Sequence, residues 1–394
     1  MVRRPFSSRV PADQGVNRLA RAIREARDGG RALIDLTLSN PTRAGFEYAS
    51  DLLAPLAHSR GLTYEPRPFG LLHARQAVAA DYMRRGISVA ADQIVLTAST
   101  SEAYSLLFKL LTDTGDEVLV PRPSYPLFDH LTQLDAVVAR PYDLEYHDGW
   151  SIDFPSVEQA LSERTRALLV VSPNNPTGSF VSRPEFKRLV AMCADRGVAI
   201  IADEVFADYQ TRLGACVDAA RTLDAREGLV FSLGGLSKSA GLPQVKLGWI
   251  ALAGADERVS GALDRLELVC DTYLSVSTPV QAAAAELLSC GAIVRKQIQT
   301  RIASNYRTLA QRVEAVPACT LLVADGGWYA VLQVPTIGSE EDLVVSLVGA
   351  GVVVHPGYFF DFPRESYLVV SLLPPEREFD EGVTTVLRHI EQAL

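Results

Sequence analysis

Four short polar segments of this sequence each follow an apolar run that has the length of a β-strand. In chain order they are residues 97–102, 172–178, 202–205 and 237–246. Each has an ordinary explanation when taken alone, because Ser, Thr and Asp cap helices, whereas Asn, Pro and Gly form turns. If they follow successive parallel strands, however, they meet at one edge of the sheet, where binding residues gather. The sequence therefore predicts that the four segments build one site.

The residue types in these segments match the chemical groups of one cofactor. Ser99, Thr100 and Ser101 stand at the expected start of a helix, where free N–H groups and hydroxyls bind a phosphate. Asp203 could face a pyridine nitrogen and keep it protonated, and Lys238 could form a Schiff base with an aldehyde. Together these groups indicate pyridoxal 5′-phosphate, an electron sink that is held by a lysine and an acidic partner.

Apolar, β-rich runs that alternate with helical stretches predict the elements that carry these segments. The runs are 94–97, 117–121, 167–171, 198–202, 229–232 and 247–252. Near-continuous apolar strands separated by helices are typical of a mostly parallel sheet that is covered on both faces. We therefore expect an α/β fold with a mostly parallel sheet of seven strands and flanking helices.

The C-terminal part of the chain has a different pattern, in which a long helical stretch leads into short strands. The helical stretch is 295–313, and the strands are 328–332 and 367–371. Short strands mixed with helices predict a smaller α+β domain, and an amphipathic helix at 15–27 is expected to pack there too. The predicted division is a large domain at 46–285 and a discontinuous small domain formed by 1–45 and 286–394.

Composition and charge exclude several classes of function. The net charge is −9 and 48% of the residues are hydrophobic, so we expect a large buried core and no binding to nucleic acid. No apolar run approaches the roughly 20 residues that span a bilayer, so no membrane association is expected. The five cysteines and six histidines lack the spacing of redox or zinc motifs. We therefore predict no metal site and a reducing compartment, the cytoplasm.

From about Asp35 to its C-terminus the chain resembles the class I and II aminotransferases. The resemblance rests on the tetrapeptide Asn-Pro-Thr-Gly at 175–178, on Asp203 at a strand end and on the pair Ser237 and Lys238. It implies a pyridoxal-phosphate enzyme of fold type I that moves an amino group between an amino acid and a 2-oxo acid in ping-pong fashion. Lys238 would then hold the cofactor as a Schiff base and carry the proton between the substrate Cα and the cofactor C4′.

The same resemblance implies a role for each further site residue. Asp203 would pair with the pyridinium nitrogen, and Asn175 would donate a hydrogen bond to the 3′-oxygen of the cofactor. Tyr125, in the Pro-Ser-Tyr-Pro stretch at 123–126, would stack on the cofactor ring. Tyr64, in the Pro-rich stretch at 64–70, would reach the phosphate held by the partner subunit, which implies a homodimer with shared active sites. The phosphate itself would be bound by Ser99, Thr100, Ser101, Ser237 and Lys246.

Three positions near the cofactor depart from the family pattern. Phe206 replaces a Tyr that donates to the 3′-oxygen, so we expect the pKa of the Schiff base to be raised. Gly235 replaces a phosphate-binding Ser, and Ser237 is expected to compensate. Lys246 replaces an Arg, which keeps the positive charge and removes the bidentate fork.

A fourth departure concerns the substrate. Many family members clamp the substrate carboxylate with an Arg two residues before a C-terminal Ser, and aligning Ser371 places Val369 there. Arginine is the natural choice for planar carboxylate recognition. Arg364 is the arginine that we expect to take over, with Arg377 and Arg307 as alternatives. Ser39 replaces a Gly near the substrate carboxylate and is expected to bind substrate as well.

Other functions compatible with these residues remain open at this point. The same fold and cofactor serve carbon–sulfur or other β-lyases, decarboxylases and oxygen-using oxidases that act on amino acids. A binding module that has lost turnover is disfavoured by the presence of Lys238, Asp203 and Asn175 together. A dinucleotide-binding dehydrogenase is disfavoured because no Gly-x-Gly-x-x-Gly follows the first strand. No basic cluster marks a dicarboxylate side-chain site, so a neutral substrate of modest size is expected.

Overall fold

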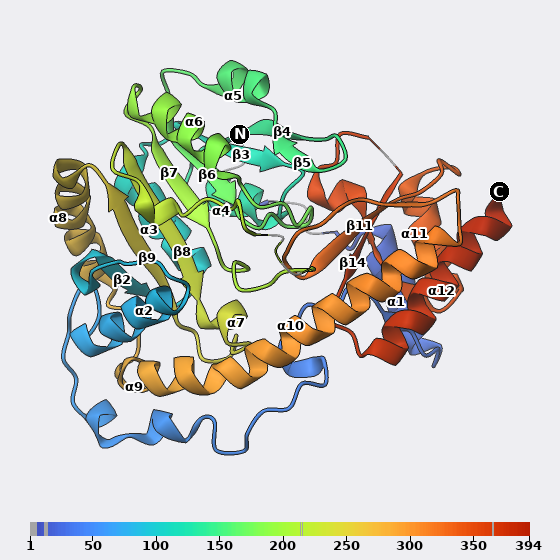
Figure 1. Ribbon diagram of the computed structural model, residues 1–394, viewed down its shortest axis with the longest axis horizontal. Helices are drawn as coiled ribbons and strands as arrows, with labels where there is room; N and C mark the ends of the chain where they lie inside the picture. The colour runs from blue at the N-terminus through green and yellow to red at the C-terminus, as the bar shows by residue number, and fades with distance from the viewer. Residues whose placement is uncertain (1–5, 12–14, 213, 215, 365) are drawn as a thin grey trace.

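A sheet of eight strands forms the centre of the larger part of the molecule (Figure 1). The computed structural model describes residues 6–11, 15–212, 214, 216–364 and 366–394. Along the sheet the strand order is β2-β9-β8-β7-β6-β3-β4-β5. Pairing is parallel from β8 through β4, whereas β9 and β5 pair with their neighbours in the antiparallel sense. The strands are β2 (Ile94–Thr97), β3 (Glu117–Arg122), β4 (Val138–Tyr146), β5 (Trp150–Ile152), β6 (Thr165–Val171), β7 (Ala199–Asp203), β8 (Leu229–Gly235) and β9 (Gly248–Gly254).

The mostly parallel α/β sheet predicted from the sequence is confirmed, and one strand is added to the seven expected. The additional strand is β5, which pairs with β4 as a hairpin at the sheet edge. The chain reverses where His147 N–H donates to Gly149 O, and the ring of Trp150 then packs edge-on against Tyr146. Most residues of β4 are exposed or half-buried, so the edge hairpin lacks the continuous apolar run that marks a central strand.

Helices cover both faces of this sheet because its central strands are apolar on both sides. On one face α3 (Thr100–Leu111), α4 (Leu127–Leu134) and α8 (Asp256–Tyr273) share a core with alternate strand residues such as Leu169 and Ile201. On the other face α5 (Phe154–Ala160) and α6 (Arg183–Ala194) pack on Leu168 and Ile200. Successive residues of a strand point to opposite faces, which is why neighbouring residues enter different cores.

The C-terminal part forms a four-stranded antiparallel sheet with the order β10-β11-β14-β13. A separate parallel pair joins the N-terminal β1 to β12, and α1 packs against α11. A discontinuous small domain requires this arrangement. Its boundaries, 1–45 and 286–394, remain a prediction. The elements are α1 (Arg18–Asp28), β1 (Ile34–Asp35), β10 (Thr320–Leu321), β11 (Tyr329–Gln333), α11 (Glu340–Gly349), β12 (Val352–Val353), β13 (His355–Pro356), β14 (Tyr367–Ser371) and α12 (Glu376–Ala393).

One long helix, α10 (Ala284–Glu314), connects the two parts and starts earlier than the sequence pattern predicts (Figure 1). Its first turns pack against α2 (Leu72–Arg84) and α7 (Leu236–Ser239), the short helix that carries Lys238. Near its far end, Asn305 donates hydrogen bonds to the backbone carbonyls of Leu372 and Pro374. The helix α10 therefore contacts both the lysine segment and the smaller sheet.

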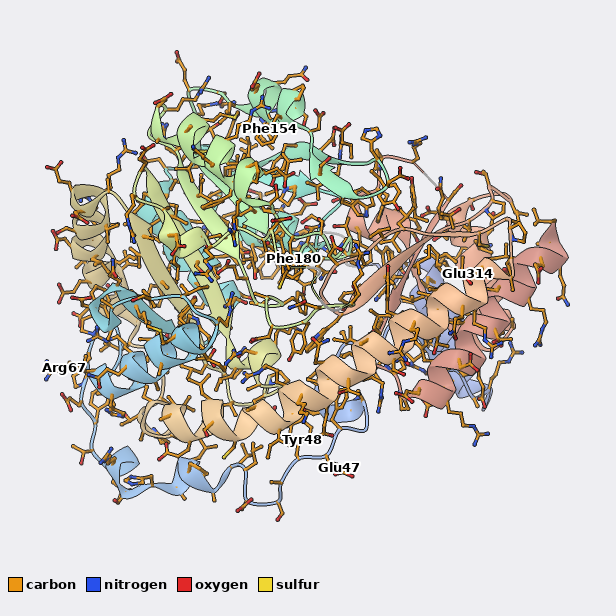
Figure 2. All side chains as sticks on the ribbon, in the orientation of Figure 1. Glu47, Tyr48, Arg67, Phe154, Phe180 and Glu314 are labelled. Carbon is orange, nitrogen blue, oxygen red and sulfur yellow. The ribbon has the colours of Figure 1, made fainter. Side chains whose placement is uncertain are left out.

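The segment before α2 lies along α10 and is tied to it (Figure 2). Gln297 exchanges two hydrogen bonds with the backbone of Glu47. The remaining helices are α9 (Thr278–Ala282) and short 3₁₀ turns at Pro41–Arg43, Ala54–Ala57, Ser59–Leu62, Ala91–Gln93, Thr222–Asp224 and Gly357–Phe360. In the described residues no helix has the length and apolar character needed to cross a membrane.

Contact between α10 and the lysine segment depends on Gly291, and this contact gives a test. A Cβ at this position would lie 2.4 Å from the Ala240 Cβ. Gly291→Val should therefore lower the free energy of unfolding by roughly 1–3 kcal/mol, measured by urea titration of the cofactor-free protein. Gly349→Ala in α11 is the matched control, because no neighbouring atom lies within 4 Å of its Cβ position. Equal effects of the two substitutions would contradict the close packing of α10 on α7.

Candidate active site

The four polar segments meet around one cavity of about 300 Å³ at the carboxyl ends of β6, β7 and β8. Of the predicted cofactor and substrate residues, those that line the cavity are Ser39, Ser99, Thr100, Ser101, Tyr125, Asn175, Asp203, Ser237, Lys238 and Lys246. Phe206, Gly235 and Tyr329 also contribute to its wall. The prediction that these separate segments would come together is therefore confirmed by their positions.

Lys238 extends from α7 into a half-buried position against aromatic rings. Its Nζ lies 4.8 Å from the centre of the Trp328 ring and 5.5 Å from that of Phe206. Burial lowers the pKa of the Lys238 amine from 10.5 to about 8, while the nearby Asp203 carboxylate opposes this shift. A larger share of the amine is consequently neutral near pH 7 than for an exposed lysine, and a neutral amine is the nucleophilic form.

Side chains from three distant segments hold the backbone of the lysine segment. The Tyr209 hydroxyl donates to the carbonyl oxygen of Lys238 itself. Arg295 of α10 donates to Ser239 O at 2.9 Å, and the Tyr48 hydroxyl donates to Gly241 O at 2.7 Å. These carbonyls lie at the end of α7, where a helix leaves acceptors without partners. Sequence analysis missed the three donors because each is far from Lys238 along the chain.

Asp203 ends β7 and is almost completely buried. Its Oδ1 accepts the backbone N–H of Val205 at 3.1 Å, and its Oδ2 accepts the Tyr104 hydroxyl at 2.8 Å. Burial raises the pKa of the Asp203 carboxyl, and the hydrogen bond from Tyr104 is the largest opposing effect. Tyr104 was not singled out from the sequence, since it lies among the apolar residues of α3, where an aromatic side chain suggests packing alone.

Ser99, Thr100 and Ser101 form a hydroxyl corner at the N-terminus of α3. Ser99 is the N-cap and accepts the backbone N–H of Glu102 at 3.2 Å, so the ordinary capping explanation holds alongside a binding role. Strand β9 passes close by: a Cβ at Gly248 would lie 3.1 Å from the backbone nitrogen of Thr100. Glycine at this position therefore lets β9 pack directly against the start of α3.

The other wall of the hydroxyl corner contains two of the departures from the family pattern. A Cβ at Gly235 would lie 3.1 Å from the Leu247 carbonyl oxygen, a contact tighter than side chains usually make. This close approach accounts for glycine where the family has a serine. Ser237 lines the cavity two residues later, and Lys246 places the second cationic side chain in its wall. Lys246 is exposed and has a positive φ of 61°.

Aromatic and amide groups complete the cavity. Tyr125 is 42% exposed, and its ring stands edge-on to that of Phe128 with 6.0 Å between centroids. Asn175 is buried, and its Oδ1 has no hydrogen-bond partner. Tyr329 of β11 lines the cavity together with Ser39, and burial raises the pKa of its phenol to about 12. Tyr329 therefore stays a neutral donor, and it is a site residue that the sequence did not indicate.

Arg364 does not line this cavity, contrary to the sequence-based expectation. It is exposed on the segment that follows the 3₁₀ turn Gly357–Phe360. Arg307 is also exposed, and Arg377 pairs with Glu381 at 2.9 Å. Val369 is completely buried opposite Val331 in the smaller sheet. Among the described residues, Lys238 and Lys246 are the cations of the cavity wall, and no arginine belongs to it.

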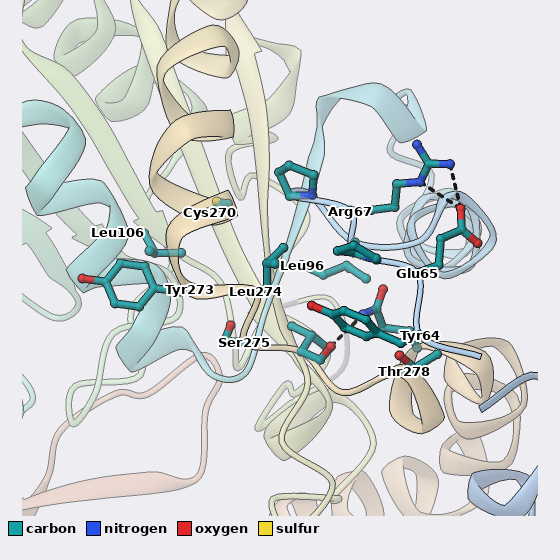
Figure 3. Close-up of a pocket in the computed structure, with 15 residues that line it drawn as sticks. Tyr64, Glu65, Arg67, Leu96, Leu106, Cys270, Tyr273, Leu274, Ser275 and Thr278 are labelled. Carbon is teal, nitrogen blue, oxygen red and sulfur yellow. Dashed lines mark hydrogen bonds and ion pairs between the residues drawn. The ribbon is translucent and has the colours of Figure 1, made fainter. Parts of the chain in front are cut away.

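Tyr64 also lies away from the cavity. It is 70% exposed on the outer segment that precedes α2, beside Glu65 and Arg67, which form an ion pair of 2.7 Å (Figure 3). The same surface includes Tyr273 at the end of α8 and the partly exposed Thr278. A direct role in the cavity of its own subunit is therefore not supported for Tyr64.

No group of three or more His, Cys, Asp or Glu side chains in the described parts of the chain is arranged to hold a metal ion. The chemistry that the cavity can perform is set by the amines of Lys238 and Lys246, one buried carboxylate, a buried amide and a helix N-terminus.

Comparison with known proteins matches residues 37–385 to the model of the aminotransferase class I and II family. The alanine aminotransferase of Mycobacterium tuberculosis is 27% identical over 371 residues, covering 90% of this chain and 84% of that protein. The glutamate-pyruvate aminotransferase AlaA of Escherichia coli is 24% identical over 380 residues, with coverage of 92% and 91%.

Solved structures agree with the fold. An alanine aminotransferase from Pyrococcus furiosus superposes with a TM-score of 0.86 at 22% identity, covering 98% of this chain and all of that one. An aspartate aminotransferase from Thermus thermophilus with maleate gives a TM-score of 0.82 at 22% identity, with coverage of 98% and 100%. The match across nearly the whole sequence, with the cavity residues in place, shows that the chain belongs to the class I and II aminotransferases and is a pyridoxal-phosphate-dependent aminotransferase.

Proposed function

We propose that this enzyme transfers the amino group of a small neutral amino acid, such as alanine, to a 2-oxo acid, and that Lys238 binds the cofactor. The observation that carries the proposal is the convergence of Lys238, Asp203 and Asn175 with the N-terminus of α3 on one cavity. These groups complement an aldehyde, a pyridine nitrogen, a ring oxygen and a phosphate in turn.

The residues present fit pyridoxal phosphate. Asn175 is buried, and its amide Nδ2, the atom that would donate to a ring oxygen, donates to no other group among the described residues. The hydroxyl corner offers hydroxyls and helix N–H groups to an anion, with the Lys246 ammonium in the same wall. Glycine at 235 and 248 lets β8, β9 and the start of α3 pack closely together around this corner.

When bound, pyridoxal phosphate supplies an electron-withdrawing ring that stabilises negative charge at the substrate Cα. Lys238, whose pKa is lowered, would hold the cofactor through its amine and, when that amine is free, would take the proton from the substrate Cα and return it. Asp203 would pair with the ring nitrogen, and Asn175 would donate to the ring oxygen. Tyr125 would pack on the ring and restrict its orientation. Because one cavity serves both the amino donor and the oxo acid, the two must alternate, which gives ping-pong kinetics.

Substrate choice follows from the charges in the cavity wall. Its two cationic side chains, Lys238 and Lys246, are both assigned to the cofactor, so a second substrate carboxylate has no cationic partner among the described residues. The remaining wall includes Leu127, Phe128 and Val205, which suit a short apolar side chain. We assign the α-carboxylate to the neutral hydroxyls of Ser39 and Tyr329. Relatives named alanine aminotransferase and glutamate-pyruvate aminotransferase support alanine as the first donor to test.

A homodimer with shared active sites is part of this proposal. Tyr64 is strongly exposed, as are Leu62 at 88% and Tyr273 at 54%, so an apolar surface is available to a second copy of the chain. Tyr64 on this surface would contact the phosphate held by the partner subunit. We also propose a cytoplasmic location, because the five cysteines of the chain are all free thiols.

The proposed reaction is tested by adding single amino acids to the loaded enzyme in the absence of an oxo acid. We expect alanine to convert the visible absorption band of the lysine-bound cofactor into that of pyridoxamine phosphate, with one pyruvate released per site. Lys238→Ala should abolish the conversion, and glutamate should react at least tenfold more slowly than alanine. Release of sulfide, carbon dioxide or hydrogen peroxide without pyridoxamine phosphate would instead identify a lyase, a decarboxylase or an oxidase.

The Lys246 ammonium gives a second test, based on cofactor affinity. Lys246→Ala should raise the dissociation constant of pyridoxal phosphate about tenfold, equivalent to about 1.4 kcal/mol, because one phosphate partner is lost. Lys246→Arg should keep most of the affinity. Lys187→Ala, at an exposed position of α6, removes the same charge elsewhere and should leave the dissociation constant unchanged. An unchanged constant in Lys246→Ala would remove this residue from the phosphate site.

The buried Lys238 amine predicts a dependence of stability on pH in the cofactor-free protein. Its folded pKa of about 8 is lower than the ordinary 10.5, so burying the charged form costs stability below pH 8. This cost decreases as the pH rises from 8 toward 10.5. Lys238→Met should therefore raise the free energy of unfolding on the order of 1–3 kcal/mol at pH 7, and by less at pH 10. An equal gain at both values of pH would contradict the lowered pKa.

A further inference from the structure

Tyr104 connects the phosphate end of the cavity to the buried carboxylate. It lies in the second turn of α3, whose first residues form the hydroxyl corner, and only 3% of its surface is exposed. Its hydroxyl donates to Asp203 Oδ2 at 2.8 Å. One helix therefore presents its N-terminus to the phosphate and a side-chain donor to the group that faces the ring nitrogen.

Few groups around Asp203 can donate a hydrogen bond to its carboxylate, so the bond from Tyr104 matters for the charge of that carboxylate. The Val205 N–H occupies the other carboxylate oxygen at 3.1 Å. The charged and titratable groups nearby are Glu204, which disfavours ionisation of Asp203, Lys238, which favours it, and the phenol of Tyr125. Glu204 is itself bound by the Ser232 hydroxyl at 2.6 Å, so it offers no donor to Asp203. Tyr104 is thus the side chain in the described structure that hydrogen-bonds the carboxylate.

Ring packing fixes the Tyr104 hydroxyl in place. Its ring stands edge-on to Phe128, with centroids 5.4 Å apart and planes at 71°. Phe128 in turn stands edge-on to Tyr125, the residue assigned to the cofactor ring, at 6.0 Å and 87°. Edge-on aromatic pairs of this kind restrict ring rotation and add to stability. The donor is therefore held toward Asp203 without relying on the hydrogen bond alone.

We propose that Tyr104 is a positioning residue that keeps the Asp203 carboxylate ionised and aimed at the ring nitrogen of the cofactor. The proposal rests on the assignment of Lys238 and Asp203 to pyridoxal phosphate. A carboxylate pairs with a protonated ring nitrogen, whereas a neutral carboxyl does not attract that charge. Without Tyr104, burial favours the neutral carboxyl more strongly, and the ring loses the partner that makes it electron-withdrawing.

The electrostatics support this geometry. Burial is the largest effect on the Asp203 carboxyl and raises its pKa, and Tyr104 supplies the largest opposing contribution. The pKa of the Tyr104 phenol is itself raised well above 10 by burial and by Asp203. The phenol therefore keeps its proton throughout the working range of pH and acts as a permanent donor. Removing the hydroxyl raises the pKa of Asp203 further, so that the carboxylate is lost at a higher pH as the solution is acidified.

The test compares two isosteric substitutions, Tyr104→Phe and Tyr142→Phe. Tyr142 is a matched control because it is equally buried and donates its own hydrogen bond, at 2.9 Å, to the carbonyl of Leu169 instead of to Asp203. The dissociation constant of pyridoxal phosphate and the visible spectrum of the bound cofactor are measured from pH 5 to pH 9. Urea unfolding of the cofactor-free variants reports the structural effect of each substitution.

We expect Tyr104→Phe to weaken cofactor binding about tenfold at the acid end and to move the acid midpoint of affinity to higher pH. Tyr142→Phe should lower stability without moving that midpoint. In an Asp203→Asn background, where no carboxylate remains to be ionised, Tyr104→Phe should change affinity less than twofold. Non-additivity of this size is the signature of two groups that act through each other.

Two outcomes would overturn the proposal. The acid midpoint could stay where it is in Tyr104→Phe, or the substitution could weaken binding equally in the Asp203→Asn background. Either result would assign Tyr104 to packing alone. The proposed function fails in a different way, namely if the unmodified protein forms no visible band with pyridoxal phosphate or if Lys238→Ala forms the same band.

Discussion

The half-buried Lys238 side chain lies against two aromatic rings, and its reactivity depends on a backbone that stays fixed while the side chain moves. Burial disfavours the ammonium and makes the amine reactive, and a reactive amine must also be held at one place in the cavity. The structure meets this requirement at the carbonyls at the end of α7. Tyr209, Arg295 and Tyr48 hold them from three different parts of the chain. The side chain alone is then left free to bind, release and transfer a proton.

The same arrangement explains why α10 is so long. Its first turns pack against the lysine segment through Gly291, and its later turns bind the backbone after β14 through Asn305. Tyr329, on the neighbouring β11, reaches the cavity from that smaller sheet. A single continuous helix thus fixes the distance between the lysine on one side of the cavity and the Ser39–Tyr329 hydroxyls on the other.

The sequence predicted the central strands and their strand-end residues because both depend on local patterns. Apolar runs marked β6, β7 and β8, and polar residues directly after them marked Asn175, Asp203 and Lys238. It did not predict β5, whose hairpin lies at a half-exposed edge. Nor did it predict Tyr104, Tyr329 or the donors to α7, whose roles come from contacts between distant segments. The choice of Arg364 failed for the same reason: nearness in sequence to β14 did not place it at the cavity.

The cavity is lined by residues far apart in the chain, such as Ser39 and Tyr329. Both the large central sheet and the smaller C-terminal sheet contribute lining residues. No fragment that lacks either part can present the complete set of groups, so the cofactor recognises only the fully assembled fold. A ligand that binds the native state alone adds stability in proportion to the logarithm of its concentration, about 2.7 kcal/mol at 100 times its dissociation constant. We therefore expect bound pyridoxal phosphate to slow proteolysis of the enzyme, an effect separate from the rate at which the enzyme turns over substrate.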